Sequence, residues 1–162
     1  MSGLAITVLV LFLNHQSHIA YYYNPQTTSI TTVYLYIVRV EATIKTCSRA
    51  DPKNATSYDK MYETYHDEIS RIVIKIGFLA GQEARFKGVS KETLLDYMEH
   101  RINIVVREIE RDAEIDPTGF RDSCRSLPKA AAAKIGPFEP LVQRFPQEMK
   151  FIQRLEDMET LP

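Results

Sequence analysis

Hydrophobic side chains recur every three or four positions over a long stretch in the middle of the chain. This spacing places them on one face of a helix. Ser57 is a suitable N-cap and Gly88 a suitable C′ residue, so we predict a helix over 58–87. The residues of its apolar face are Tyr62, Tyr65, Ile69, Ile72, Val73, Ile76 and Leu79.

A second periodic segment follows almost at once. It extends from an N-cap at Ser90 to about Ile115, where Asp116-Pro117 ends one helix and caps the next. Its apolar face comprises Leu95, Met98, Ile102, Val105, Val106 and Ile109. Because the connection around Gly88 is short, the two helices must lie antiparallel, as a helical hairpin.

The pattern after this hairpin is shorter and interrupted by prolines. We predict short helices over 117–125 and 129–134, an irregular stretch containing Pro137, Pro140 and Pro146, and a closing helix over 147–161. The predicted fold class is therefore all-α: a small bundle of four to five helices built on a long antiparallel helical hairpin.

The start of the chain has a different pattern, with few polar positions. Leu4–Leu13 has the length of a signal-peptide h-region and is too short to cross a bilayer. No basic residue precedes it, and the polar residues 14–18 offer no typical cleavage site. Residues 4–23 reach the length of a span but contain those polar residues, so a signal peptide and a weak uncleaved anchor both remain open.

Residues 27–44 are rich in Thr, Tyr, Val and Ile, which favour strands. Apolar residues occupy both parities, so both faces of such a strand would be buried. Three alternatives are open. The segment is a second h-region cleaved after Ala42, a β-ribbon, or part of a misassigned start of the coding sequence.

Charged residues divide the chain at about the same place. The chain has 20 basic and 21 acidic residues, yet only Arg39, Glu41 and Lys45 lie within residues 1–45. We therefore predict a low-charge N-terminal segment over 1–45, which is signal-like, anchor-like or misassigned, and a helical domain over 46–162.

Net charge points to no polyanionic partner. The formal charge is −1, and both signs are mixed along the chain. A mild basic run of Arg121, Arg125, Lys129 and Lys134 lacks the interleaved aromatic residues of many nucleic-acid sites. We expect no nucleic-acid partner, and a membrane partner only if residues 4–23 remain as an anchor.

Two cysteines indicate the compartment. Cys47 precedes the first long helix and Cys124 follows the second, so an antiparallel hairpin brings both to the same end. We predict a disulfide between them, which persists only in an oxidising compartment, and hence a periplasmic or secreted protein. Asn54-Ala55-Thr56 is a glycosylation sequence that matters only in a eukaryotic secretory pathway.

Candidate catalytic chemistry is sparse. Glu63 and His66 are one turn apart on the first long helix and could share a metal, but the other Glu/His neighbours, Glu99 and His100, are adjacent and point in different directions. A solvated polar face is the favoured interpretation. We expect no catalytic residues, no metal site and no cofactor.

One aromatic group is a candidate binding patch. Tyr58, Tyr62 and Tyr65 line the start of the first long helix, and Phe120 is predicted at the same end of the bundle. Core packing of these rings is the alternative. The predicted function is a small exported binding protein, such as an inhibitor, an immunity protein or a chaperone-like module, whose partner is another protein. The alternatives are a metal-dependent enzyme using Glu63 and His66, and a membrane-tethered protein.

Overall fold

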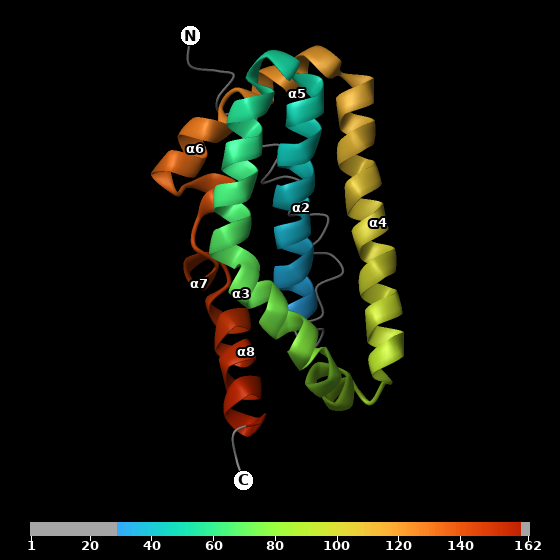
Figure 1. Cartoon of the computed structure of the whole chain (residues 1–162). Coiled ribbons are helices and arrows are strands. Elements are labelled where there is room, and N and C mark those ends of the chain that lie inside the picture. Colours follow the sequence, from blue (N-terminus) through green and yellow to red (C-terminus); the bar gives the residue numbers. More distant parts are fainter. Residues whose placement is uncertain (1–28, 160–162) are drawn as a thin grey trace.

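A computed structural model describes residues 29–159, which form an all-α bundle (Figure 1). The elements are α2 (Ser29–Ala50), η1 (Pro52–Asn54), α3 (Ala55–Lys87), α4 (Lys91–Ile115), α5 (Pro117–Cys124), α6 (Leu127–Ala133), η2 (Gly136–Phe138), α7 (Leu141–Arg144) and α8 (Pro146–Glu159). The predicted fold class is confirmed, including the long helical hairpin of α3 and α4. Within residues 29–159, none of the helices combines the length and the apolarity that a membrane span requires.

Helix α2 lies at the centre of this bundle and packs against α3, α4, α5 and α8 (Figure 1). Its buried apolar residues recur at alternating steps of three and four, which is the helical period. They are Ile30, Val33, Ile37, Val40, Ile44 and Cys47. A helix that is apolar on most sides must be surrounded by other elements, so α2 provides the middle of the core.

Of the three alternatives for residues 27–44, the β-ribbon is wrong, because residues 29–44 belong to α2. Nor is position 45 a boundary of the described fold, since the same helix continues to Ala50. Cleavage after Ala42 would cut through the central helix and remove part of the core. The expected h-region and anchor, within residues 4–23, lie outside the described residues.

The three charged residues before position 46 all face partners from the later helices. Arg39 Nη2 donates to Glu108 Oε2 at 3.0 Å, and Glu41 Oε1 lies 2.8 Å from His66 Nδ1. Lys45 Nζ lies 4.4 Å from the centre of the Tyr62 ring. These contacts join α2 to both α3 and α4, so residues 29–45 are an integral part of the bundle.

The turn between α3 and α4 follows the expected chemistry. Gly88 has a φ of +68°, in the left-handed region that favours glycine, and its N–H donates to the carbonyl of Arg85. The Ser90 hydroxyl accepts a hydrogen bond from the backbone N–H of Thr93, which caps α4. The helix start predicted at residue 58 lies earlier, at Ala55.

A disulfide joins the C-terminal turn of α2 to that of α5. The S–S distance between Cys47 and Cys124 is 2.05 Å and their Cα atoms are 5.6 Å apart. Both residues are buried. The predicted disulfide is therefore present, and it closes a separation of 77 residues that contains α3 and α4.

Candidate functional site

A polar cluster around the buried Asp51 and Tyr58 lies beside the disulfide, where α2, α3 and α5 meet. Asp51 Oδ2 accepts hydrogen bonds from Asn54 Nδ2 at 2.8 Å and from the Tyr58 hydroxyl at 3.3 Å. Arg125 Nε lies 3.8 Å from the same oxygen. Burial, followed by the nearby Asp51 carboxylate, raises the pKa of Tyr58. Because its partners all come from the bundle itself, this cluster holds the end of the bundle together.

The four aromatic residues of the predicted binding patch do not form an exposed surface. Tyr58 and Tyr65 are buried, and the Tyr65 ring meets the Phe138 ring edge-on with centres 5.8 Å apart. Burial raises the pKa of the Tyr65 hydroxyl. Phe120 packs against the core and is half-buried. The structure thus places most of this group in the core, and Tyr62 is half-exposed.

Tyr62 belongs to a polar contact between α2 and α3 at the surface. Its ring stacks on His66 with centres 5.6 Å apart, while Lys45 lies over it. The Nδ1 atom of His66 pairs with Glu41 Oε1, which fixes the imidazole against α2. His66 itself remains half-exposed on the surface of the bundle.

Glu63 and His66, the pair that could share a metal, both lie on α3. The carboxylate contact that the structure shows for His66 is with Glu41 from the neighbouring helix α2, at 2.8 Å. Over residues 29–159, no three His, Cys, Asp or Glu side chains are grouped as metal ligands would be.

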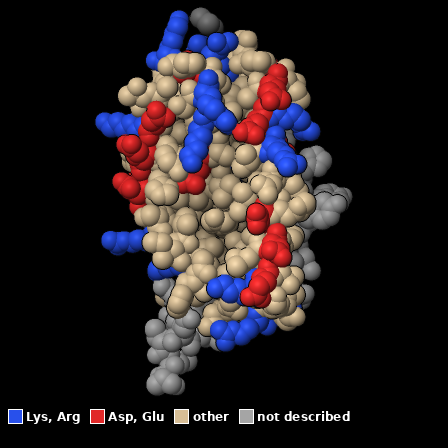
Figure 2. Space-filling model, turned by 45° about the vertical axis from the view of Figure 1, so that its right-hand side comes forward, with Lys and Arg blue, Asp and Glu red and all other residues tan. Residues whose placement is uncertain are grey.

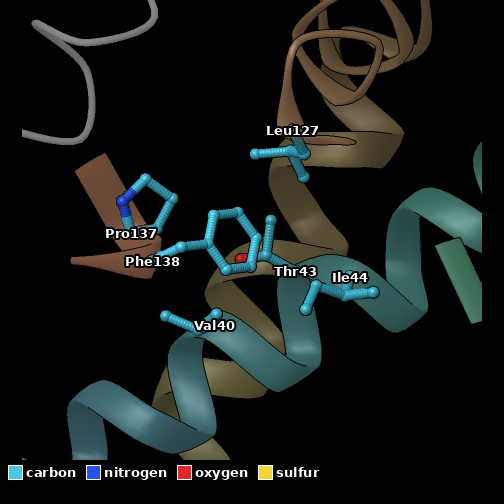
Figure 3. A pocket seen from close by; sticks show the side chains of 6 residues that line it. All are labelled: Val40, Thr43, Ile44, Leu127, Pro137 and Phe138. Carbon is cyan, nitrogen blue, oxygen red and sulfur yellow. The ribbon is translucent and has the colours of Figure 1, made fainter. Parts of the chain in front are cut away.

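A small hollow lies between α2 and the segment around η2. Figure 3 shows its lining, which is apolar except for the Thr43 hydroxyl. That hydroxyl donates to the Arg39 carbonyl at 2.8 Å. The hollow contains about 170 Å³ of empty space, part of which is open to solvent, and none of it is wide enough to admit a water molecule. Its lining residues are Val40, Thr43, Ile44, Leu127, Pro137 and Phe138.

Glu83 is a buried carboxyl group that the sequence analysis did not identify. Its side chain is fully buried, and within residues 29–159 neither carboxyl oxygen forms a hydrogen bond of ordinary geometry, although the Ile30 backbone N–H at the start of α2 lies close enough to lower the pKa of this carboxyl. Lys87 Nζ lies 3.7 Å from Oε1. Burial raises the pKa of Glu83 to about 7, and Lys87 opposes this shift. The sequence could have indicated this burial, since Glu83 follows Ile76 and Leu79 at helical spacing on the core face.

The outer surface carries both signs of charge and several large apolar side chains. On the face shown in Figure 2, acidic and basic residues are interspersed around an uncharged area. Several apolar side chains are more than half exposed, which makes them the available anchors for a protein contact. They are Ile74, Phe78, Tyr97, Ile115, Ile135 and Val142.

No protein-family model matches this chain, and no curated protein or solved structure is significantly similar to it. The function must therefore be argued from the residues themselves.

Proposed function

We propose that this chain is a small exported, disulfide-stabilised helical protein that acts by binding another protein, as an inhibitor, immunity protein or chaperone-like module does. The buried Cys47–Cys124 disulfide carries the proposal. Disulfides of this structural kind persist in secreted and periplasmic proteins and are rare in the cytosol of mesophiles.

Export has a second support in the sequence. The apolar run Leu4–Leu13 has the length of an h-region, and it precedes α2, which begins at Ser29. Removal of a signal peptide anywhere between these two points would leave the described bundle complete.

Binding to a protein is supported by the exposed apolar side chains. Ile115 and Ile135 are 73% and 57% exposed, and Val142 is 62% exposed. Apolar side chains of this kind can supply the apolar core of a protein interface when a partner buries them. The small apolar hollow, in contrast, offers little room for a small-molecule ligand.

The compartment is tested by trapping free thiols in the native cell with a mass-increasing maleimide, followed by N-terminal sequencing of the mature protein. We expect both cysteines to be oxidised and the mature chain to begin between residues 14 and 29. Fully reduced cysteines in the native cell would overturn export. An intact N-terminus in carbonate-washed membranes would instead support the membrane-tethered alternative.

Binding is tested with a photo-crosslinking residue placed in the full chain at Ile115, Ile135 or Val142. We expect at least one of these positions to capture a defined partner protein in the native compartment. Exposed Lys53 on η1 is the matched control position and should capture nothing specific. Equal background labelling at all four positions would contradict the proposed binding function at these sites.

A further inference from the structure

The outer face of α3, opposite the core, carries an unusual residue pattern. Ile74 and Phe78 are 73% and 64% exposed, although they are large and apolar. Asp67 lies two turns before Ile74 and Arg85 lies two turns after Phe78, and both are exposed. Spacings of seven, four and seven place these four residues on one side of the helix, along a line that follows the bend of α3 (Figure 1). We call this line the α3 outer face.

The order of residues on the α3 outer face is symmetric except for the sign of charge. Read from either end, it gives a charged residue, an apolar residue one heptad away, a second apolar residue, and a charged residue of opposite sign. In an antiparallel pairing of two such faces about the level of residue 76, Ile74 of each copy faces Phe78 of the other. Asp67 of each copy then faces Arg85 of the other, so every favourable contact occurs twice.

A parallel pairing of the same faces would be unfavourable. It would place Asp67 against Asp67 and Arg85 against Arg85, and like charges repel. Among residues 29–159, neither Asp67 nor Arg85 forms an ion pair within its own chain, and the one hydrogen bond of the Arg85 side chain runs from Nε to the Gly81 carbonyl at 3.4 Å. The charge pattern therefore favours a second copy of this chain as the partner of the α3 outer face, with its α3 helix antiparallel to the first.

Two glycines beside this line leave room for close contact. A Cβ atom at Gly77 would meet nothing within 4 Å, and at Gly81 only Lys91 Cδ, at 3.7 Å. No atom of the same chain would therefore collide with a larger side chain at position 77. In the antiparallel pairing, Gly81 lies level with Arg71 of the second copy, and the missing side chain leaves space for this long one.

We infer that the α3 outer face is the surface through which two copies of this protein pair antiparallel. The inference deepens the proposed function and rests on it, since it names the surface and one partner of a protein that acts by contact. A contact between single helices is smaller than a standard stable interface, so we expect a weak dimer that forms only at high protein concentration.

Charge reversal on the full, oxidised chain tests this pairing by sedimentation velocity, at concentrations from about 10 µM to about 1 mM. D67R places Arg against Arg85 of the second copy, and R85D places Asp against Asp67. Each change acts at two symmetric places, so we expect each to weaken dimerisation about tenfold or more. The double variant D67R/R85D restores both opposite-charge pairs and should dimerise like the wild type.

Mixing the two single variants in equal amounts should also restore dimers, because one copy then carries two basic residues and the other two acidic ones. D112R, an exposed charge reversal on α4, is the matched control and should leave the dimer unchanged. All of these residues are exposed, so thermal melts should show that every variant folds.

A chain that stays monomeric up to the highest concentration would overturn the pairing. A double variant that dimerises as weakly as the single variants would also overturn it. Exchanging the two charges restores the dimer only if residues 67 and 85 of the two copies face each other. The proposed exported function fails on a different result, which is the finding of reduced Cys47 and Cys124 in the native cell.

Discussion

Reduction of the Cys47–Cys124 disulfide should remove a large part of the stability of this protein. The bond joins α2 to α5 and constrains the intervening chain in the unfolded state. Both sulfur atoms are buried, so two thiols would occupy nearly the same space after reduction. The main effect should therefore come from the unfolded chain, which gains conformational freedom when the loop opens.

The size of the effect follows from the loop. For a separation of 77 residues, chain-entropy reasoning gives about 4.5 kcal/mol at 25 °C. Small domains have a total free energy of unfolding of about 5–15 kcal/mol. Reduction should thus lower the urea midpoint by about 2 M. It should also lower Tm by about 15 °C.

Urea denaturation followed by circular dichroism, with and without a reductant, measures this difference. The double variant C47A/C124A is the control: it should start near the stability of the reduced wild type and should not respond to the reductant. An unchanged midpoint on reduction of the wild type would refute the reasoning and would also weaken the case for export.

Three further substitutions, at Glu83, Gly88 and Gly77, have expected outcomes. The pKa of Glu83 is raised to about 7 from 4.5, so between these values the folded chain holds a proton that the unfolded chain releases. The free energy of unfolding should therefore fall by up to about 3 kcal/mol as the pH rises from about 4.5 to 7. Denaturation across this range should show that decline, and E83Q should flatten it; a flat wild-type profile would contradict the buried carboxyl. G88A should lower the free energy of unfolding by about 1 kcal/mol, because Gly88 has a positive φ. G77A, in the interior of α3 with open space around it, should instead raise this free energy by about 0.5–1 kcal/mol when measured at low protein concentration. If G88A and G77A changed the free energy of unfolding equally, the positive φ of Gly88 would not explain the effect of G88A.

The hairpin could be predicted because its sequence signals are local and agree with one another. The periodic apolar face, the glycine at position 88 and the cap at Ser90 each specify the same turn. The disulfide then followed from geometry, since an antiparallel hairpin brings Cys47 and Cys124 to one end. The short helices after Pro117 were also predicted close to their observed positions.

Helix α2 was missed because its composition reflects its environment. A helix surrounded on most sides has many apolar residues, and β-branched ones such as Val33 and Ile37 also favour strands. The buried set from Ile30 to Cys47 does follow the helical period, so the signal was present but masked by apolar residues at the other positions.

The candidate site was less predictable than the fold. Sequence spacing within one helix suggested Glu63 as the neighbour of His66, whereas the observed neighbour, Glu41, comes from another helix. Likewise, Tyr58 and Tyr65 face inward because of the elements packed on them, which a single helix does not reveal. Contacts between elements distant in sequence decide such sites.

The central position of α2 affects the order in which the protein can form. It is the first described helix to leave the ribosome, yet its partners extend to α8, which contributes the buried Ile152. Until that last helix has been synthesised, apolar side chains of α2 lack part of their cover and remain a target for aggregation. Contacts this distant in sequence also slow folding. Completion of the core must therefore follow synthesis of nearly the whole chain, so the chain is still incompletely folded when its N-terminus could engage a translocation machinery.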